Sequence, residues 1–98
     1  MLRDQTLAVL GAGNIGSALI GGLLRGDDVP AAQIRATRRR DHALATLRDR
    51  FPGITASSDN PEAVRGANIV IVAVKPQNAA GLLQEIQPHV APGTLVLS

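Results

Sequence analysis

The chain has 98 residues, of which 45% are hydrophobic, and a formal net charge of +2 at pH 7, which suits one globular domain. It contains no Cys, Tyr or Trp, and this excludes disulfides, thiolate metal sites and the stacking platforms that bind single-stranded nucleic acid. His42 and His89 lie far apart without acidic residues at metal-ligand spacing, and the apolar run at the N-terminus is too short for a signal peptide or a membrane span. We therefore expect a cytoplasmic domain with no metal site and with neither nucleic acid nor membrane as a partner.

Residues 6–10 form a short apolar run that predicts a buried strand. The motif Gly-Ala-Gly-Asn-Ile-Gly occupies residues 11–16, and residues 17–24 predict a helix. A strand, a GxGxxG turn and a helix form the context in which this motif indicates dinucleotide binding. Its first glycine permits the tight turn, its second leaves the backbone open to a pyrophosphate, and its third lets the helix pack closely on the strand. The helix then offers free N–H groups and a positive dipole end to the phosphates.

Apolar residues in this first helix recur at spacings of three and four, which predicts one buried face. That face consists of Ile15, Ala18, Leu19, Gly22 and Leu23. Gly21 and Gly22 in the helix interior each cost roughly 1 kcal/mol relative to Ala. Such a cost indicates either close packing against a neighbour or a weak helix.

The second strand, predicted at residues 34–37, runs directly into Arg38, Arg39 and Arg40, with no acid before Asp41. A NAD site usually places an Asp or Glu about 20 residues after the glycines, to bind the ribose 2′-hydroxyl. Guanidinium groups instead bind a 2′-phosphate through charge-assisted hydrogen bonds. The arginines therefore favour NADP over NAD; a solvated basic cluster or a nucleic-acid patch is the alternative.

Beyond the arginines we expect three more helices and three more strands. The helices are predicted at residues 41–51, from 60 to near 66, and around 79–86, and the strands at 54–56, 69–74 and 95–97. Asn60 stands before Pro61 and is expected to be the N-cap of the short helix. The buried faces of the two longer helices are expected to contain Leu44, Leu47 and Phe51, and Ala79, Leu82, Leu83 and Ile86.

Strands that alternate with helices predict an α/β fold with right-handed crossovers. We expect a Rossmann-like, doubly wound parallel sheet of strand order 3-2-1-4-5 in three α/β/α layers. Residues 69–74 are apolar throughout, as expected for a central strand covered on both faces. The ligand crevice should lie at the carboxyl ends of strands one and four.

Lys75 is the single lysine of the chain and follows the fourth predicted strand. Pro76 restricts it to an extended conformation. We interpret this segment as a loop against a nicotinamide ribose, or else as a strand end with a solvated lysine.

Residues 10–16, the pair Asp59-Asn60 and the segment Val-Ala-Val-Lys-Pro-Gln at 72–77 together resemble the N-terminal domain of pyrroline-5-carboxylate reductases. The resemblance covers nearly all of the chain, and its most specific part is Ala-Val-Lys-Pro-Gln. Enzymes of this family reduce 1-pyrroline-5-carboxylate to proline with NADPH or NADH.

The resemblance implies that cofactor-binding residues lie in four segments. Residues 10–15 would contact the pyrophosphate, Thr37 and Arg38 with nearby Arg39 the 2′-phosphate, Asn60 the adenosine, and residues 73–76 the nicotinamide ribose. The implied set is Leu10, Gly11, Ala12, Gly13, Asn14, Ile15, Thr37, Arg38, Arg39, Asn60, Ala73, Val74, Lys75 and Pro76. NADPH is the expected cofactor, with NADH weaker.

In the family, a helical C-terminal domain makes the dimer and supplies most of the imino-acid site. Residues 1–98 are therefore expected to form one dinucleotide-binding domain, without catalytic residues that could be named. The full-length protein is expected to be a homo-oligomer, and the chain by itself is expected to bind cofactor without reducing the imino acid.

Two other classes share such a first domain. One is a β-hydroxyacid or deazaflavin-linked oxidoreductase, against which Gly13-Asn14-Ile15 and Lys75-Pro76-Gln77 argue. The other is a nucleotide-sensing module without enzyme activity, which commonly keeps the ribose-binding acid that Thr37-Arg38-Arg39 replaces.

Overall fold

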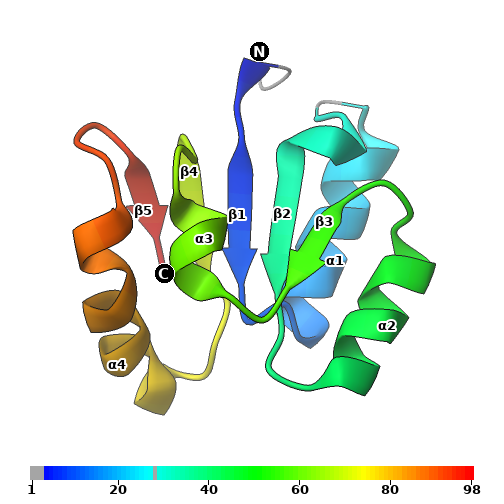
Figure 1. Cartoon of the computed structure of the whole chain (residues 1–98). Coiled ribbons are helices and arrows are strands. Elements are labelled where there is room, and N and C mark those ends of the chain that lie inside the picture. Colours follow the sequence, from blue (N-terminus) through cyan, green and yellow to red (C-terminus); the bar gives the residue numbers. More distant parts are fainter. Residues whose placement is uncertain (1–3, 28) are drawn as a thin grey trace.

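The computed structural model describes residues 4–27 and 29–98 of the chain. Its five strands form one parallel sheet in the predicted order β3-β2-β1-β4-β5, with helices on both faces (Figure 1). The strands are β1 (Leu7–Leu10), β2 (Ile34–Thr37), β3 (Thr55–Ser57), β4 (Ile69–Val72) and β5 (Leu95–Leu97). The helices are α1 (Asn14–Arg25), α2 (Asp41–Arg50), α3 (Asn60–Val64) and α4 (Pro76–Ile86), with 3-10 turns η2 (Ala31–Gln33) and η3 (Gln87–His89). The predicted Rossmann-like fold is thus confirmed.

The centre of the sheet is β1, whose four residues are all buried. Leu7 and Val9 face α1 and α2, whereas Ala8 and Leu10 face α3 and α4. Burial of each large side chain stabilises the fold by roughly 1.5–3 kcal/mol. The two apolar clusters, one on each face, hold the carboxyl end of β1 in place.

The prediction that the fourth strand would be covered on both faces is only half right. It ends at Val72, and residues 73–75 lead into α4. Val70 and Val72 are buried beneath α3 and α4, but Ile69 and Ile71 on the other face are half-buried. The α1 layer therefore covers β1 and β2 more fully than β4.

The predicted buried face of α1 is wrong. The buried residues are Gly16, Ser17, Ile20 and Gly21. Of the predicted residues, Ala18, Gly22 and Ile15 are exposed, Ile15 by 81%, and Leu19 and Leu23 are half-buried. A Cβ at Gly16 would lie 3.2–3.3 Å from side chains of Val9, Ala12 and Ala73. The small residues therefore let the helix approach the sheet, and this close approach determines which face is buried.

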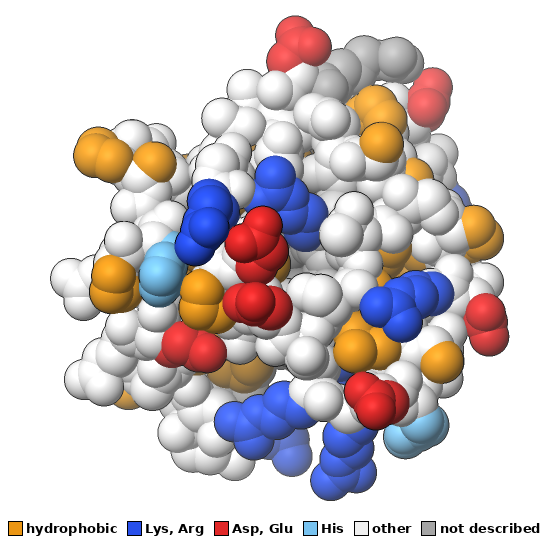
Figure 2. Space-filling model, in the orientation of Figure 1, with side chains coloured by type: hydrophobic (Ala, Val, Ile, Leu, Met, Phe, Trp, Pro, Cys, Tyr) orange, Lys and Arg blue, Asp and Glu red, His pale blue; other side chains and the backbone are white. Residues whose placement is uncertain are grey.

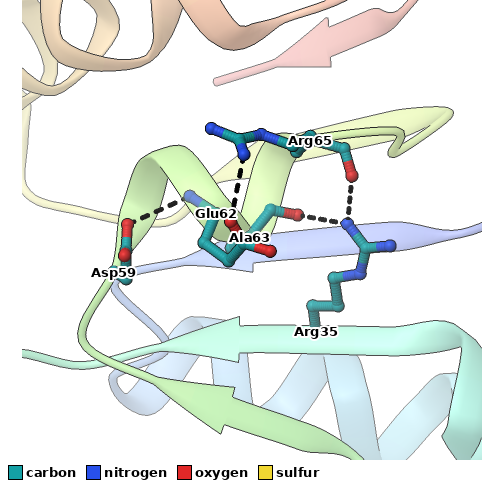
Figure 3. Close-up of polar contacts among 5 residues, drawn as sticks. All are labelled: Arg35, Asp59, Glu62, Ala63 and Arg65. Carbon is teal, nitrogen blue, oxygen red and sulfur yellow. Dashed lines mark hydrogen bonds and ion pairs between the residues drawn. The ribbon is translucent and has the colours of Figure 1, made fainter.

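The short helix α3 is held at both ends by side chains (Figure 3). Asp59 is its N-cap, with a carboxylate oxygen accepting from the Glu62 N–H at 3.0 Å, so the prediction of Asn60 as N-cap is wrong. At the other end, the Arg35 guanidinium donates to the carbonyl oxygens of Ala63 and Arg65, where a cation complements the helix dipole. Since Asp59 performs the capping, the Asn60 side chain is free for other contacts.

The β5 edge of the sheet exposes apolar side chains. Leu95, Val96 and Leu97 are 53%, 37% and 46% exposed. Leu82 and Ile86 of α4 are buried as predicted, but Leu83 is 37% exposed. Within the described residues, no helix has the length and apolar character needed to cross a membrane.

Candidate functional site

The glycine turn at residues 11–13 joins β1 to α1 at the carboxyl edge of the sheet. Gly11 has φ +70°, a conformation that side-chain-bearing residues rarely adopt. The Ala12 N–H donates to the Thr37 carbonyl at 2.8 Å, and the Ala73 N–H donates to the Leu10 carbonyl at 2.9 Å. The turn is therefore fixed from β2 on one side and from the end of β4 on the other.

Two side chains lie against the glycines of this turn. A Cβ at Gly11 would clash with Val74 Cγ1, and a Cβ at Gly13 would lie 2.8 Å from Arg38 Nη1. Val74 and Arg38 therefore flank the turn from β4 and β2. The Arg38 guanidinium thus lies beside Gly13, in the turn that the sequence assigns to a pyrophosphate.

The N-terminus of α1 opens onto this turn. Its N-cap is Gly13, which supplies no side chain to the first helical N–H groups, and no acid occupies the first turn. Such an end combines free N–H donors with the positive end of the helix dipole. A phosphate is the group that this arrangement binds well.

Basic side chains line the same edge. Arg38 is half-buried, with its backbone N–H donating to the Ser57 carbonyl at 3.1 Å, and Arg39 is exposed. In Figure 2, basic side chains reach the lower edge of the molecule, toward which the strand arrows point in Figure 1. The first acid after β2 is Asp41, in the first turn of α2. The edge thus favours an anionic ligand.

Thr37 is buried, with 2% exposure. Its hydroxyl oxygen accepts from the Gly11 N–H at 3.0 Å, and its hydroxyl donates to Asn60 Oδ1 at 2.6 Å. In the ligand-free chain this hydroxyl holds the glycine turn. The contact of Thr37, Arg38 and Arg39 with a 2′-phosphate stays a prediction, in which the two arginines offer the free donors.

Lys75 is exposed at the N-cap of α4, in the predicted extended conformation (φ −62°, ψ 148°), and Pro76 is the first residue of the helix. Ala73 and Val74 are half-buried against the glycine turn. The structure therefore brings residues 73–76 to the same edge as the turn. Their contact with a nicotinamide ribose stays a prediction.

Sequence reasoning missed two features of this edge: the position of Arg38 over Gly13, and the contact of Glu85 with the Asn60 amide, at 3.2 Å from Nδ2 to Oε1. Glu85 lies on α4, 25 residues after Asn60, and no local pattern links them. Among the described residues, no group of three His, Cys, Asp or Glu could hold a metal ion.

A hollow of about 450 Å³ lies elsewhere, between α4, η3 and β5. Its lining includes Leu83, Ile86, Val90 and Val96 and contains no charged side chain. A multiply charged nucleotide would lose its solvation there without gaining a counter-charge. The glycine-turn edge, with its basic side chains, is therefore the better candidate.

Comparisons with known proteins identify the family of the chain. Residues 6–98 match the protein family described as NADP oxidoreductase coenzyme F420-dependent. The chain is 40% identical over 97 residues to the pyrroline-5-carboxylate reductase of Pseudomonas aeruginosa, covering 99% of this chain and 35% of that protein. The chain thus spans about a third of the length of such curated relatives.

Two solved structures have the same fold. The pyrroline-5-carboxylate reductase of Coxiella burnetii has a TM-score of 0.86 at 22% identity, over 94% of this chain and 34% of that one. The pyrroline carboxylate reductase of Plasmodium falciparum, crystallised with NADP bound, has a TM-score of 0.78 at 23% identity, over 96% and 32%. The sequence comparisons confirm the resemblance stated above, while these structures establish the fold alone.

Proposed function

Because the chain belongs to the NADP oxidoreductase coenzyme F420-dependent family, we propose that it binds NADPH at the glycine turn. The observation that carries this proposal is the Arg38 guanidinium, whose Nη1 would lie 2.8 Å from a Cβ at Gly13. One cationic side chain thereby stands beside both the turn and the end of β2. The end of β2 carries no acidic residue, so no negative charge there repels a 2′-phosphate.

The residues of the site fit a dinucleotide in three respects. The turn carries no side chain at Gly11 or Gly13, the N-terminus of α1 offers N–H donors, and Arg38, Arg39 and Lys75 supply positive charge. We assign the pyrophosphate to the turn and the first residues of α1, the 2′-phosphate to Arg38 and Arg39, and the nicotinamide ribose to residues 73–76. Bound NADPH supplies a hydride to a substrate.

We further propose that the whole protein is a pyrroline-5-carboxylate reductase that reduces the imino acid to proline. Support comes from the curated relatives of that name, including one at 40% identity. Since the chain spans about a third of their length, we assign the substrate site, the catalytic residues and the homo-oligomer interface to sequence outside these residues. A fold of this kind serves many substrates, so the substrate rests on sequence similarity.

The second candidate is an oxidoreductase that transfers hydride between NADP and coenzyme F420, because the family description names that coenzyme. The residues at the start of α4, Lys75-Pro76-Gln77, favour the reductase instead. Both candidates use the same NADP site in this chain.

Calorimetric titration of the purified chain with NADPH and NADH tests the cofactor assignment. We expect NADPH to bind at least roughly tenfold more tightly than NADH, as one charge-assisted hydrogen bond would provide. Equal affinities would contradict the role of the arginines, and no binding of either cofactor would contradict the function.

A further inference from the structure

Glu85 links helix α4 to the glycine turn through two side chains. Its Oε1 accepts from Asn60 Nδ2 at 3.2 Å, Asn60 Oδ1 accepts from the Thr37 hydroxyl at 2.6 Å, and the Thr37 Oγ1 accepts from the Gly11 N–H at 3.0 Å. We call these three side chains the Thr37–Asn60–Glu85 chain. It runs from α4 through the start of α3 to the end of β2, and there it reaches the turn.

The direction of these hydrogen bonds depends on how the Asn60 amide is oriented. An amide presents an acceptor at one end and donors at the other, while a hydroxyl has one proton to donate. With Oδ1 toward Thr37, the hydroxyl proton is used and an oxygen lone pair remains for the Gly11 N–H. With the amide reversed, Nδ2 would compete for that oxygen, and the buried hydroxyl proton would lose its acceptor.

A carboxylate can only accept hydrogen bonds, so Glu85 favours the orientation in which Nδ2 points toward it. Asn60 does not cap α3, because Asp59 does, and its side chain therefore serves this contact rather than the helix end. Nothing in the sequence motif requires an acid at position 85.

We propose that Glu85 is a positioning residue for the cofactor site, which fixes the Asn60 amide and through it the Thr37 hydroxyl that holds the Gly11 N–H. The part of the proposal that concerns hydrogen bonds rests on the geometry of the ligand-free protein. The effect on the cofactor rests on the proposed function.

Amide hydrogen exchange of the ligand-free chain, measured by NMR, tests the hydrogen-bond part. The Gly11 N–H bonds to the Thr37 side chain, whereas the neighbouring Ala12 N–H bonds to the Thr37 backbone carbonyl. In Glu85→Ala we expect Gly11 to exchange roughly two- to tenfold faster, the equivalent of one weakened hydrogen bond, with Ala12 unchanged. Glu85→Gln keeps an acceptor for Asn60 and should restore slow exchange at Gly11.

Gln84→Ala is the matched control, because Gln84 is an exposed neighbour on the same helix and should leave both amides unchanged. Unchanged exchange at Gly11 in Glu85→Ala would overturn the proposal. So would faster exchange at Gly11 and Ala12 together, since that pattern indicates general loosening of the turn.

Titration with NADPH tests the effect on the cofactor. Glu85→Ala and Glu85→Gln remove the same negative charge, so their difference isolates the hydrogen bond. We expect the dissociation constant of Glu85→Ala to exceed that of Glu85→Gln roughly two- to fivefold. Equal constants would overturn the positioning role. If the unaltered protein bound no NADPH, the proposed function would fail. The exchange rate of the Gly11 amide would still show whether Glu85 positions Asn60 and Thr37.

Discussion

Replacement of Arg38 by Gln should weaken NADPH binding far more than NADH binding. Arg38 is half-buried, and its Nη1 lies 2.8 Å from where a Gly13 Cβ would stand. The guanidinium therefore stands beside the turn before the ligand arrives, where it can donate charge-assisted hydrogen bonds to a phosphate. The two cofactors differ only in the 2′-phosphate, and their comparison therefore isolates the contact in question.

The expected loss for NADPH follows from one charge-assisted hydrogen bond, worth about 1.5–3 kcal/mol, or roughly 10- to 100-fold in affinity. For NADH we expect less than roughly threefold, because only the long-range attraction of one positive charge to the pyrophosphate is lost. Isothermal titration of both cofactors into the unaltered and variant chains at the same ionic strength measures both changes.

Arg25→Gln provides the matched control, since it also removes one positive charge from an arginine. Arg25 is exposed at the last residue of α1, about 18 Å along the helix from the glycine turn. That distance exceeds the screening length of ~8 Å at physiological salt, so both affinities should be unchanged. Equal losses of NADPH and NADH affinity in Arg38→Gln would refute the assignment of the 2′-phosphate to this residue.

Three further outcomes are expected. Gly16→Ala should be less stable than Gly22→Ala by about 1–3 kcal/mol in denaturant unfolding. A Cβ at Gly16 would lie 3.2–3.3 Å from neighbouring side chains, while one at Gly22 would meet nothing within 4 Å. Equal stabilities would contradict the close packing of α1. Lys75→Ala should weaken the binding of NADPH roughly tenfold. The binding of 2′,5′-ADP, which lacks the nicotinamide half, should be almost unchanged. An unchanged affinity for NADPH would show that Lys75 is only a solvated lysine at the start of α4. The exposed apolar side chains of β5 should make the chain self-associate in sedimentation and Leu95→Lys should reduce this; a monodisperse monomer at high concentration would contradict it.

The sheet order and the glycine turn could be predicted because each depends on local pattern. Short apolar runs between helical segments specify parallel strands. The motif at residues 11–16 needs glycines for a tight turn and a close approach of the backbone, and glycines at this spacing are visible in the sequence. The face of α1 could not be read in the same way. Apolar periodicity favoured Ile15, but Gly16 is small enough to let the helix approach the sheet, and Gly21 on the same buried side faces the Phe51 ring.

The polar contacts of the site depend on tertiary structure and were predicted less well. Asp59 and Asn60 are both good capping residues, and only the fold shows that Asp59 caps α3 while Asn60 meets Thr37. Thr37 stands next to the arginines in sequence, yet its hydroxyl is buried and bonded to Gly11 and Asn60. The contact with Glu85 joins residues on different helices, which no spacing rule covers.

The central claim is that the glycine turn and the basic residues beside it bind NADPH. Titration of the isotope-labelled chain with NADPH, followed by NMR, tests it most directly because each backbone amide reports its own environment. We predict saturable shifts at Gly13, Ile15, Arg38 and Lys75, with the shift at Arg38 smaller when NADH is used. Shifts confined to the apolar hollow around Val96, or none at millimolar NADPH, would contradict the account.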